Sequence, residues 1–307
     1  MKVTMKKWIS LLLAGTMTMA LAACGATSSS STAATEGSSA PAASSTAASS
    51  EEASSAATEA GSLSGKIATG GSTSVEKVIN ALMEGYAELQ PGVQITYEPT
   101  GSGAGITGVA EGTLDLGLSS RYLKDEEKEQ GLVENVFALD GIALVVHSDN
   151  TVTDLTPEQI KGLATGEITN WSEVGGPDAP VVPIGREAGS GTRDGFESVI
   201  GVEDACKYQQ ELTSTGAVIS AVASNPNAFG YASLAAVGDT VKVVSVSGVT
   251  PSVETVQDGS YVLQRPFVMV TKEGTELSEQ AQNFLDFATS ADAASLIELG
   301  DAVAPQK

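Results

Sequence analysis

The chain has 307 residues and a formal charge of −22, from 16 basic and 38 acidic side chains, with a single histidine. Such acidity argues against nucleic acid as a partner and gives no long-range attraction for anionic ligands, because like charges repel. Any anion site must therefore depend on local dipoles and individual side chains. The sequence has no cysteine and histidine cluster at metal-ligand spacing, so we expect neither a metal nor another cofactor.

The first 23 residues have the organisation of a secretory signal peptide: three lysines, a short apolar run, and small residues before a cleavage point. The apolar run is too short to predict a membrane-spanning helix. The segment Leu21-Ala22-Ala23-Cys24 is similar to the lipobox of bacterial lipoproteins. This resemblance implies that Cys24 carries diacylglycerol and palmitate and becomes the N-terminus. The alternative is an ordinary signal peptide with an incidental cysteine.

Residues 24–62 consist almost entirely of Ser, Ala, Thr, Gly and Glu. Without larger aliphatic side chains, this segment cannot bury enough apolar surface to offset the entropy lost on ordering. We predict a disordered tether, whose reach as a flexible coil is on the order of 35 Å. The rest of the chain is long enough for one large domain or two smaller ones. Its single cysteine, Cys206, is expected to act as a buried small hydrophobe.

After the tether, short strands alternate with helical patterns. Strands are predicted at 66–68, 93–97, 115–118, 181–184, 229–231 and 241–246. Helices are predicted over 75–86, around 106–109, over 156–166, from 192, over 217–223 and within 277–299. Pro91-Gly92 should end the first helix, whereas Thr156 and Pro157 suit the start of the third.

Two long apolar runs, at 136–146 and 261–270, are each long enough to pass between two lobes. If both do so, the residues between them form an inserted second lobe. Strands that alternate with helices indicate an α/β fold with a largely parallel sheet.

Three predicted strand-to-helix turns combine glycine with hydroxyl residues, at 70–74 (GGSTS), 100–105 (TGSGAG) and 188–192 (AGSGT). The first N–H groups of a helix lack internal partners and carry the positive end of the helix dipole. Glycine lets the backbone approach a ligand, and a hydroxyl adds a donor. Such turns can bind a phosphate-like anion. Each could instead be an ordinary helix cap, and Thr73 with Glu76 matches a capping box.

Two other patterns are weaker. The segment GAGITG at 103–108 matches the dinucleotide-binding glycine pattern, but the acids about twenty residues later lie in the charged helical run 124–130. Ser190 lies between glycines, as in a nucleophile elbow, but the first glycine of that motif is missing. The only histidine, His147, ends an apolar strand and is most simply structural.

Arginines supply the positive charge that the three turns lack. Arg186 precedes AGSGT and has the fork geometry to hold two oxygens of a tetrahedral oxyanion. Arg121, after Ser119-Ser120, is a second candidate. We expect the third, Arg193, to point away and to be neutralised by Asp194. For any single arginine, the alternative is a surface salt bridge that contributes little.

At these residues the chain resembles the phosphate-binding lipoproteins that serve the phosphate ABC transporter. The resemblance rests on GSTSV, TGSGAGI, DLGLSSR, DGIALVVH, LTPEQIKGLATGEITNW and GREAGSGTRDGFE, in the family's order between about residues 66 and 300. It implies a type II periplasmic-binding-protein fold, with two α/β lobes joined by a two-strand hinge. The first lobe would comprise residues 63–142 and 262–307, and the second lobe residues 143–261.

The resemblance also implies the anion contacts. The first lobe would supply Thr73, Ser74, Ser102 and Ser120; the second would supply Arg186, Ser190, Gly191 and Thr192; Ser72 and Arg121 are further candidates. Glu187 is expected to orient Arg186. Many members of the family have an aspartate at the position of Ser120, where it accepts a hydrogen from phosphate and so rejects fully deprotonated oxyanions. A serine there leaves that selectivity open.

The sequence therefore predicts a monomeric receptor, lipid-anchored on the extracytoplasmic face of the cell membrane. It would capture inorganic phosphate and deliver it to the membrane permease subunits of an ABC transporter, without catalysis. One alternative is a receptor for another tetrahedral oxyanion: sulfate, arsenate or molybdate. A second alternative is a secreted phosphoester hydrolase.

Overall fold

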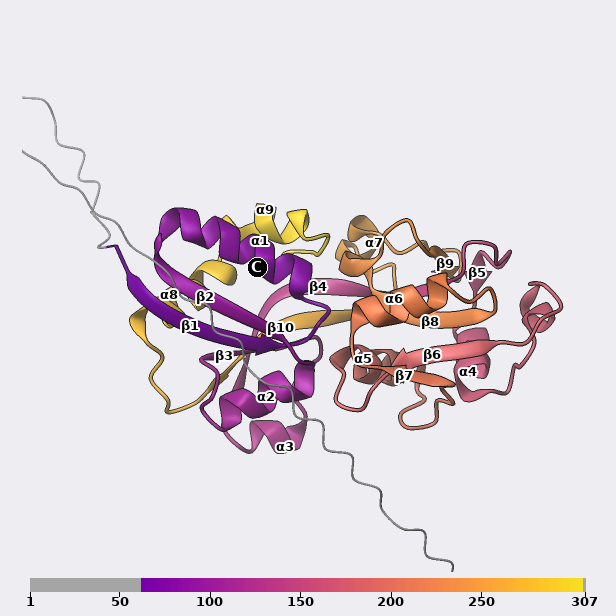
Figure 1. Ribbon diagram of the computed structural model, residues 1–307, viewed down its shortest axis with the longest axis horizontal. Helices are drawn as coiled ribbons and strands as arrows, with labels where there is room; N and C mark the ends of the chain where they lie inside the picture. The colour runs from indigo at the N-terminus through magenta and orange to yellow at the C-terminus, as the bar shows by residue number, and fades with distance from the viewer. Residues whose placement is uncertain (1–61, 306–307) are drawn as a thin grey trace, which may run out of the picture. The chain divides into compact units, whose positions relative to one another are not determined.

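The computed structural model describes residues 62–305 (Figure 1). The predicted signal peptide, Cys24 and residues 24–61 of the predicted tether lie outside the described residues. Within 62–305, no helix is both long and apolar enough to cross a membrane.

The first lobe is a parallel sheet covered by helices, drawn in purple and yellow in Figure 1. Its strands β1, β2 and β3 pair in parallel, with β1 in the centre. The bounds of the elements of this lobe are β1 (Ser64–Gly71), α1 (Glu76–Leu89), β2 (Gly92–Pro99), α2 (Ser102–Ala110), β3 (Leu116–Ser119), α3 (Asp125–Lys128), α8 (Glu279–Ala288), η3 (Ala291–Ala293) and α9 (Ala294–Leu299).

Two antiparallel strands connect the first lobe to the second, β4 (Leu132–Val146) and β10 (Gln264–Lys272). Between Leu132 and Gly141, β4 pairs with β10, whereas from Ile142 onward it pairs with β8 and β9 of the second lobe. Figure 1 shows both strands running from one group of elements to the other. They are the two long apolar runs of the sequence. The predicted lobe boundaries at 142/143 and 261/262 stay predictions.

The second lobe also has a sheet with parallel pairs, β6 with β7 and β8, and β5 with β9. Its elements are β5 (Asp154–Leu155), α4 (Pro157–Thr165), η1 (Trp171–Val174), β6 (Val182–Arg186), α5 (Gly191–Ile200), β7 (Gln210–Leu212), α6 (Thr215–Ala223), β8 (Ala228–Ser233), η2 (Leu234–Ala236), β9 (Lys242–Val246) and α7 (Val253–Gln257). As predicted, Thr156 caps α4 and Pro157 opens it.

Each lobe has its own hydrophobic core. In the first, the inner face of α1, with Ile79, Leu82 and Tyr86, packs with Phe284 of α8. In the second, Phe196 stacks on Tyr231 with ring centroids 4.2 Å apart. Burying one such side chain contributes about 1.5–3 kcal/mol. The two cores meet at the crossing strands, since Ala235 of η2 packs in the first core and Val303 in the second. Among the described strands, β4 pairs with strands of both lobes and so links their sheets.

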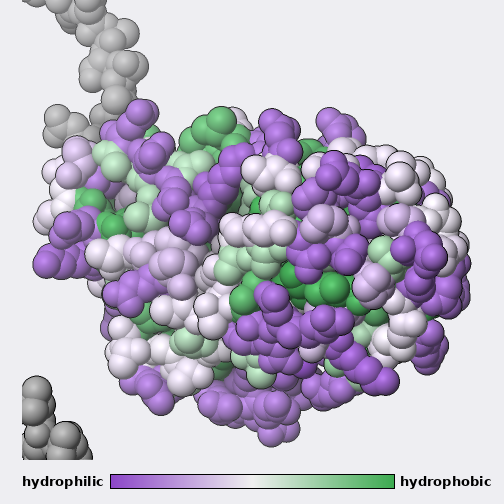
Figure 2. All heavy atoms as spheres, turned by 45° about the vertical axis from the view of Figure 1, so that its right-hand side comes forward, coloured by the Kyte–Doolittle hydropathy of each residue, from purple (hydrophilic) through white to green (hydrophobic). Residues whose placement is uncertain are grey.

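The surface seen in Figure 2 is mainly hydrophilic. On the face shown in Figure 2, apolar side chains form small groups between hydrophilic ones. The exposed large apolar residues in 62–305 are scattered along the sequence and over different elements: Leu89, Tyr122, Val133, Val199, Val262 and Leu299, of which Val199 belongs to the second lobe.

The predicted fold class is confirmed: the chain is a mixed α/β protein with two lobes and two crossing strands. The prediction of a largely parallel sheet holds within each lobe, and the antiparallel pairs between the named strands all involve β4 or β10. The short elements β5, β7 and α7 were not predicted, because segments of two to five residues carry no measurable periodicity.

Candidate anion-binding site

In the first lobe, hydroxyl residues lie at the carboxyl ends of the parallel strands. Ser72, Thr73 and Ser74 follow β1, Ser102 opens α2, and Ser120 follows β3. All five side chains are buried. The chain reaches this arrangement through Gly71, whose φ of +134° and close approach to the Leu118 carbonyl exclude a side chain.

These hydroxyls form a connected network. Ser72 Oγ donates to Ser120 Oγ at 2.9 Å, and Ser102 Oγ lies 3.3 Å from the same atom. The backbone N–H of Ser120 donates to Ser102 Oγ at 3.1 Å, and that of Ser74 to Ser72 Oγ at 3.2 Å. Because a hydroxyl both donates and accepts, the network can adjust its hydrogens to an oxyanion.

The second lobe places one arginine and two helix N-termini opposite these hydroxyls. Arg186 ends β6, Ser190 caps α5 by accepting from the N–H of Arg193, and Gly191 and Thr192 open that helix. Thr215 opens α6 behind the cap Ser214. Arg186, Ser190, Thr192 and Thr215 are each at most 2% exposed.

The two lobes touch at this site. Ser74 Oγ lies 2.7 Å from Thr192 Oγ1 and 3.0 Å from Thr215 Oγ1, and Thr73 Oγ1 lies 3.1 Å from Thr215 Oγ1. A Cβ atom at Gly191 would lie 2.5 Å from Ser102 Oγ and 2.7 Å from Ser120 Oγ. The glycine therefore allows the start of α5 to approach the first lobe.

The Arg186 guanidinium is held in place by acceptors of its own lobe. Its Nε and Nη2 donate to the two carboxylate oxygens of Glu187, at 3.0 and 2.8 Å, and also to the carbonyls of Leu212 and Thr213. Its Nη1 donates to Thr215 Oγ1 at 3.2 Å. Glu187 thus orients Arg186, as expected. Because Glu187 occupies Nε and Nη2, the pair of nitrogens that could hold two oxygens of an anion, Nη1 is the nitrogen directed at the hydroxyl cluster.

Two predictions about the other arginines need correction or refinement. Arg121 is directed to carboxylates: Glu127 holds its Nη1 and Nη2, and Asp194 lies 2.8 Å from its Nε. Arg193 does point away, toward Glu197 and Glu211. The prediction that Asp194 neutralises Arg193 is wrong, because Asp194 is paired across the cleft with Arg121.

Of the two helix-cap alternatives, the one for Ser190 is confirmed and the one for Thr73 is wrong. Ser190 is a cap, as one alternative held. The capping-box alternative for Thr73 and Glu76 is wrong, because α1 is capped at Val75 without a side-chain hydrogen bond. The Thr73 hydroxyl instead accepts from the backbone N–H of Thr215 at 3.2 Å.

Sequence reasoning missed Thr215. The signal was present in Ser214-Thr215-Gly216, which resembles the other hydroxyl and glycine turns and precedes a predicted helix. Its hydroxyl lies within hydrogen-bond distance of Thr73, Ser74 and Arg186, so it belongs to the same cluster.

Ser190 and His147, the candidate nucleophile and base for hydrolysis, are not hydrogen-bonded to each other. Ser190 Oγ accepts from the N–H of Arg193, and His147 Nδ1 accepts from the N–H of Asp149. Cys206 is half-buried, not fully buried as expected, and packs against the second-lobe core. Its partial burial raises the pKa of the thiol to about 11, which keeps it in the unreactive protonated form. In the described part of the chain, no group of three or more His, Cys, Asp or Glu side chains could hold a metal ion.

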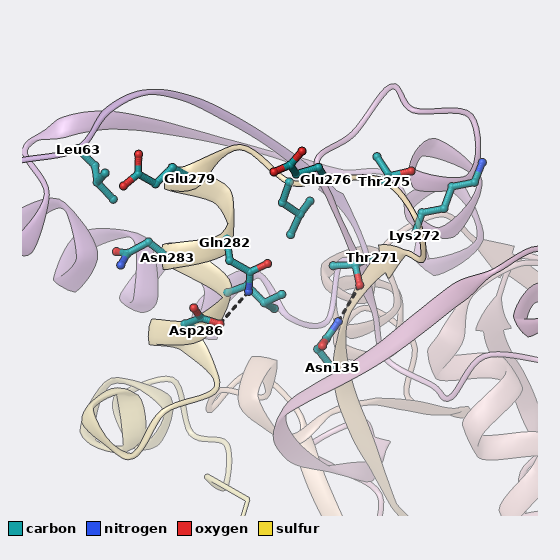
Figure 3. A pocket seen from close by; sticks show the side chains of 12 residues that line it. Leu63, Asn135, Thr271, Lys272, Thr275, Glu276, Glu279, Gln282, Asn283 and Asp286 are labelled. Carbon is teal, nitrogen blue, oxygen red and sulfur yellow. Dashed lines mark hydrogen bonds between the residues drawn. The ribbon is translucent and has the colours of Figure 1, made fainter.

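A separate surface pocket of about 730 Å³ lies between β10 and α8 of the first lobe (Figure 3). It contains Glu276, Glu279 and Asp286, and its amide side chains are partly engaged, as Gln282 donates to Asp286 at 2.8 Å. Lys272 reaches away from it to the Ala110 carbonyl. Because its charges are mainly negative, this pocket is unsuited to an anion.

Comparisons with known proteins agree with this geometry. A family model described as the PBP superfamily domain matches residues 25–292. The phosphate-binding protein PstS of Bacillus subtilis strain 168 is 32% identical over 235 residues, covering 75% of this chain and 77% of that protein.

Two solved structures are also similar. One is assigned as a phosphate ABC transporter substrate-binding protein from Clostridium perfringens and holds bound phosphate. It has 41% identity and a TM-score of 0.76, and the match covers 79% of this chain and all of that chain. The other is an ABC-type phosphate transport receptor from Vibrio cholerae, with 34% identity and a TM-score of 0.65 over 78% of this chain and all of that one.

Proposed function

Because the chain belongs to the PstS family of phosphate-binding proteins within the PBP superfamily, we propose that it captures inorganic phosphate between its two lobes and delivers it to an ABC permease for import. The observation that carries this proposal is the buried cluster of hydroxyls drawn from both lobes, which Arg186 Nη1 joins through Thr215. An anion that bonds to both lobes favours the conformation in which they meet, and only in proportion to those contacts.

The anion contacts we propose are those predicted from the sequence: Thr73, Ser74, Ser102, Ser120, Arg186, Ser190, Gly191 and Thr192, with Ser72 as a further hydroxyl. Helix N-termini and hydroxyls replace the lost hydration of the anion, since an unpaired buried charge would be very costly. Glu187 offsets the charge of Arg186. Binding would therefore depend more on many directed hydrogen bonds than on net charge.

Selectivity among oxyanions is set, in this proposal, by hydroxyls. The contacts of Ser120 are the hydroxyls of Ser72 and Ser102, and the carboxylate of Glu187 is turned to Arg186. A hydroxyl accepts the hydrogen of phosphate but does not repel a fully deprotonated anion as a carboxylate would. We therefore expect arsenate to bind nearly as well as phosphate, and sulfate and molybdate to be rejected less strictly than by relatives with an aspartate at this position.

A receptor without catalytic activity is the proposal that fits the site, since Ser190 lacks a neighbouring base among its hydrogen-bond partners. We further propose that the protein acts as a monomer, anchored through lipid on Cys24 to the extracytoplasmic face of the cell membrane. Residues 24–62 would tether the domain near its permease.

Titration calorimetry of the mature domain with phosphate, arsenate, sulfate and molybdate tests the proposal. We expect phosphate to bind with micromolar or tighter affinity. Absence of binding heat for phosphate at several temperatures, with saturable heat for sulfate or molybdate, would replace phosphate with that anion. Turnover of a chromogenic phosphate ester that Ser190→Ala abolishes would overturn the receptor function.

A further inference from the structure

A second polar contact joins the lobes beside the hydroxyl cluster. Arg121, in the loop after β3, lies with its Nε 2.8 Å from Asp194 Oδ2 on α5. Its side chain is 9% exposed and that of Asp194 25%, so solvent screens the pair only partly. Lys124 Nζ lies 3.8 Å from the same carboxylate oxygen.

Arg121 is oriented within its own lobe. Glu127 accepts from Nη1 and Nη2, both at 2.8 Å, and the Tyr122 carbonyl accepts from Nη1. This bidentate grip involves first-lobe residues alone and does not depend on the second lobe. The guanidinium is thus held ready for Asp194, which reduces the side-chain entropy lost when the pair forms.

Both residues are adjacent to the proposed anion contacts. Arg121 directly follows Ser120, and Asp194 lies in the first turn of α5, two residues after Thr192. A carboxylate in that turn opposes an anion at the same helix N-terminus, because the two carry like charge. Pairing with Arg121 compensates that repulsion when the lobes meet.

We propose that Arg121 and Asp194 form an ionic clasp that fixes the start of α5 against Ser120 and masks the Asp194 charge from the bound anion. Both are positioning residues for binding. The inference rests on the proposed function, and it assigns Arg121 a role in the closed conformation in place of direct contact with phosphate.

A double-mutant cycle in the mature domain tests the clasp. Arg121→Gln should weaken phosphate binding by about tenfold, because it removes the pair and leaves Asp194 only the more distant, exposed Lys124 as a counter-ion. Adding Asp194→Asn to that variant should raise its phosphate affinity by about threefold, since the charge that repels the anion is gone. In the wild-type background, Asp194→Asn should weaken binding. The sign of the Asp194→Asn effect therefore reverses between backgrounds.

Stopped-flow kinetics supplies the second measurement. Loss of the clasp should act mainly by raising the phosphate dissociation rate, as expected for a contact made only when the lobes meet. Lys128→Gln is the matched control: it breaks an ion pair with Glu134 inside the first lobe and should leave affinity unchanged.

The outcomes separate the two proposals. If the wild-type domain does not bind phosphate, the proposed function fails. If it binds phosphate and Asp194→Asn changes the affinity by the same factor in both backgrounds, the clasp is wrong. An effect of Lys128→Gln as large as that of Arg121→Gln would also overturn the clasp, because general charge loss would then explain both.

Discussion

Two buried arginines, one in the cleft and one in the crossing strands, have similar partners and different surroundings. Arg186 is 1% exposed and Arg265 of β10 is 4% exposed. Each pairs with one carboxylate through Nε and Nη2, Glu187 for Arg186 and Asp140 for Arg265. The two sites differ in the surroundings of the third guanidinium nitrogen, Nη1, and in how deeply the carboxylate is buried.

In the cleft, Arg186 Nη1 faces the Thr215 hydroxyl, and the Glu187 side chain is 27% exposed. In the crossing strands, Arg265 Nη1 is buried without a partner among the described residues, and the guanidinium lies over the Phe267 ring. Asp140 is fully buried and also accepts from Ser233 Oγ.

The comparison teaches that burial and pairing alone do not mark an arginine as a binding group. Burial raises the pKa of Asp140 and lowers the pKa of Arg265, so each charge would be costly without the other. The Arg265 pair is therefore structural. Arg186 is suited to binding because its Nη1 donates to the Thr215 hydroxyl, which belongs to the cleft cluster and can exchange partners.

The largest effect should come from breaking the structural pair. Asp140→Asn leaves the Arg265 charge buried without a counter-ion, which should cost about 3 kcal/mol of unfolding free energy and lower Tm by roughly 10 °C. Thermal and urea unfolding measure this. Asp140→Leu combined with Arg265→Met should be less destabilised than Asp140→Asn, because no charge remains buried. A loss below about 1 kcal/mol for Asp140→Asn would remove the distinction between the two arginines.

The next largest effect concerns binding. Arg186→Ala should weaken phosphate affinity by about tenfold or more, because anion charge loses its charged donor in a buried site. Arg186→Lys should keep only part of the affinity that Arg186→Ala loses. A lysine ammonium cannot bond to Glu187 and to the Leu212 and Thr213 carbonyls at once, so it would be less well oriented. Lys161→Ala, which removes an exposed positive charge from the second lobe, is the control for net charge. Unchanged affinity for Arg186→Ala in calorimetry would exclude Arg186 from the site.

Much of the fold and of the candidate site could be predicted from the sequence, because the longer helices and strands have a clear local hydrophobic pattern. Helix α1 follows from apolar residues at helical spacing, and β4 and β10 from long apolar runs. The glycine and hydroxyl turns predicted the site because strand ends of one sheet meet at one edge.

The pairing of distant residues could not be predicted. Arg121 and Asp194 are far apart in sequence, and only the folded chain brings them to 2.8 Å. Thr215 was missed because a threonine before a helix has the sequence pattern of an ordinary cap. The partner of Arg265 was equally hidden, since strand register rather than local sequence sets it opposite Asp140.

The smallest predicted effect concerns a third arginine, Arg121, and its ion-pair partner Glu127, whose carboxylate is only partly buried. Partial desolvation raises the pKa of Glu127, but hydrogen bonds from Arg121 and from the Lys124 N–H outweigh it and hold the pKa below its usual value. A carboxylate with a lowered folded pKa stabilises the fold above its unfolded pKa and loses that contribution as pH falls through the folded pKa. Comparing wild type with Glu127→Gln by urea unfolding, we expect wild type to be more stable by about 1 kcal/mol or less at neutral pH, with the difference shrinking toward zero in acid. A difference that persists at low pH would mean that Glu127 acts by packing, whereas one that grows would reverse the sign of its coupling to Arg121.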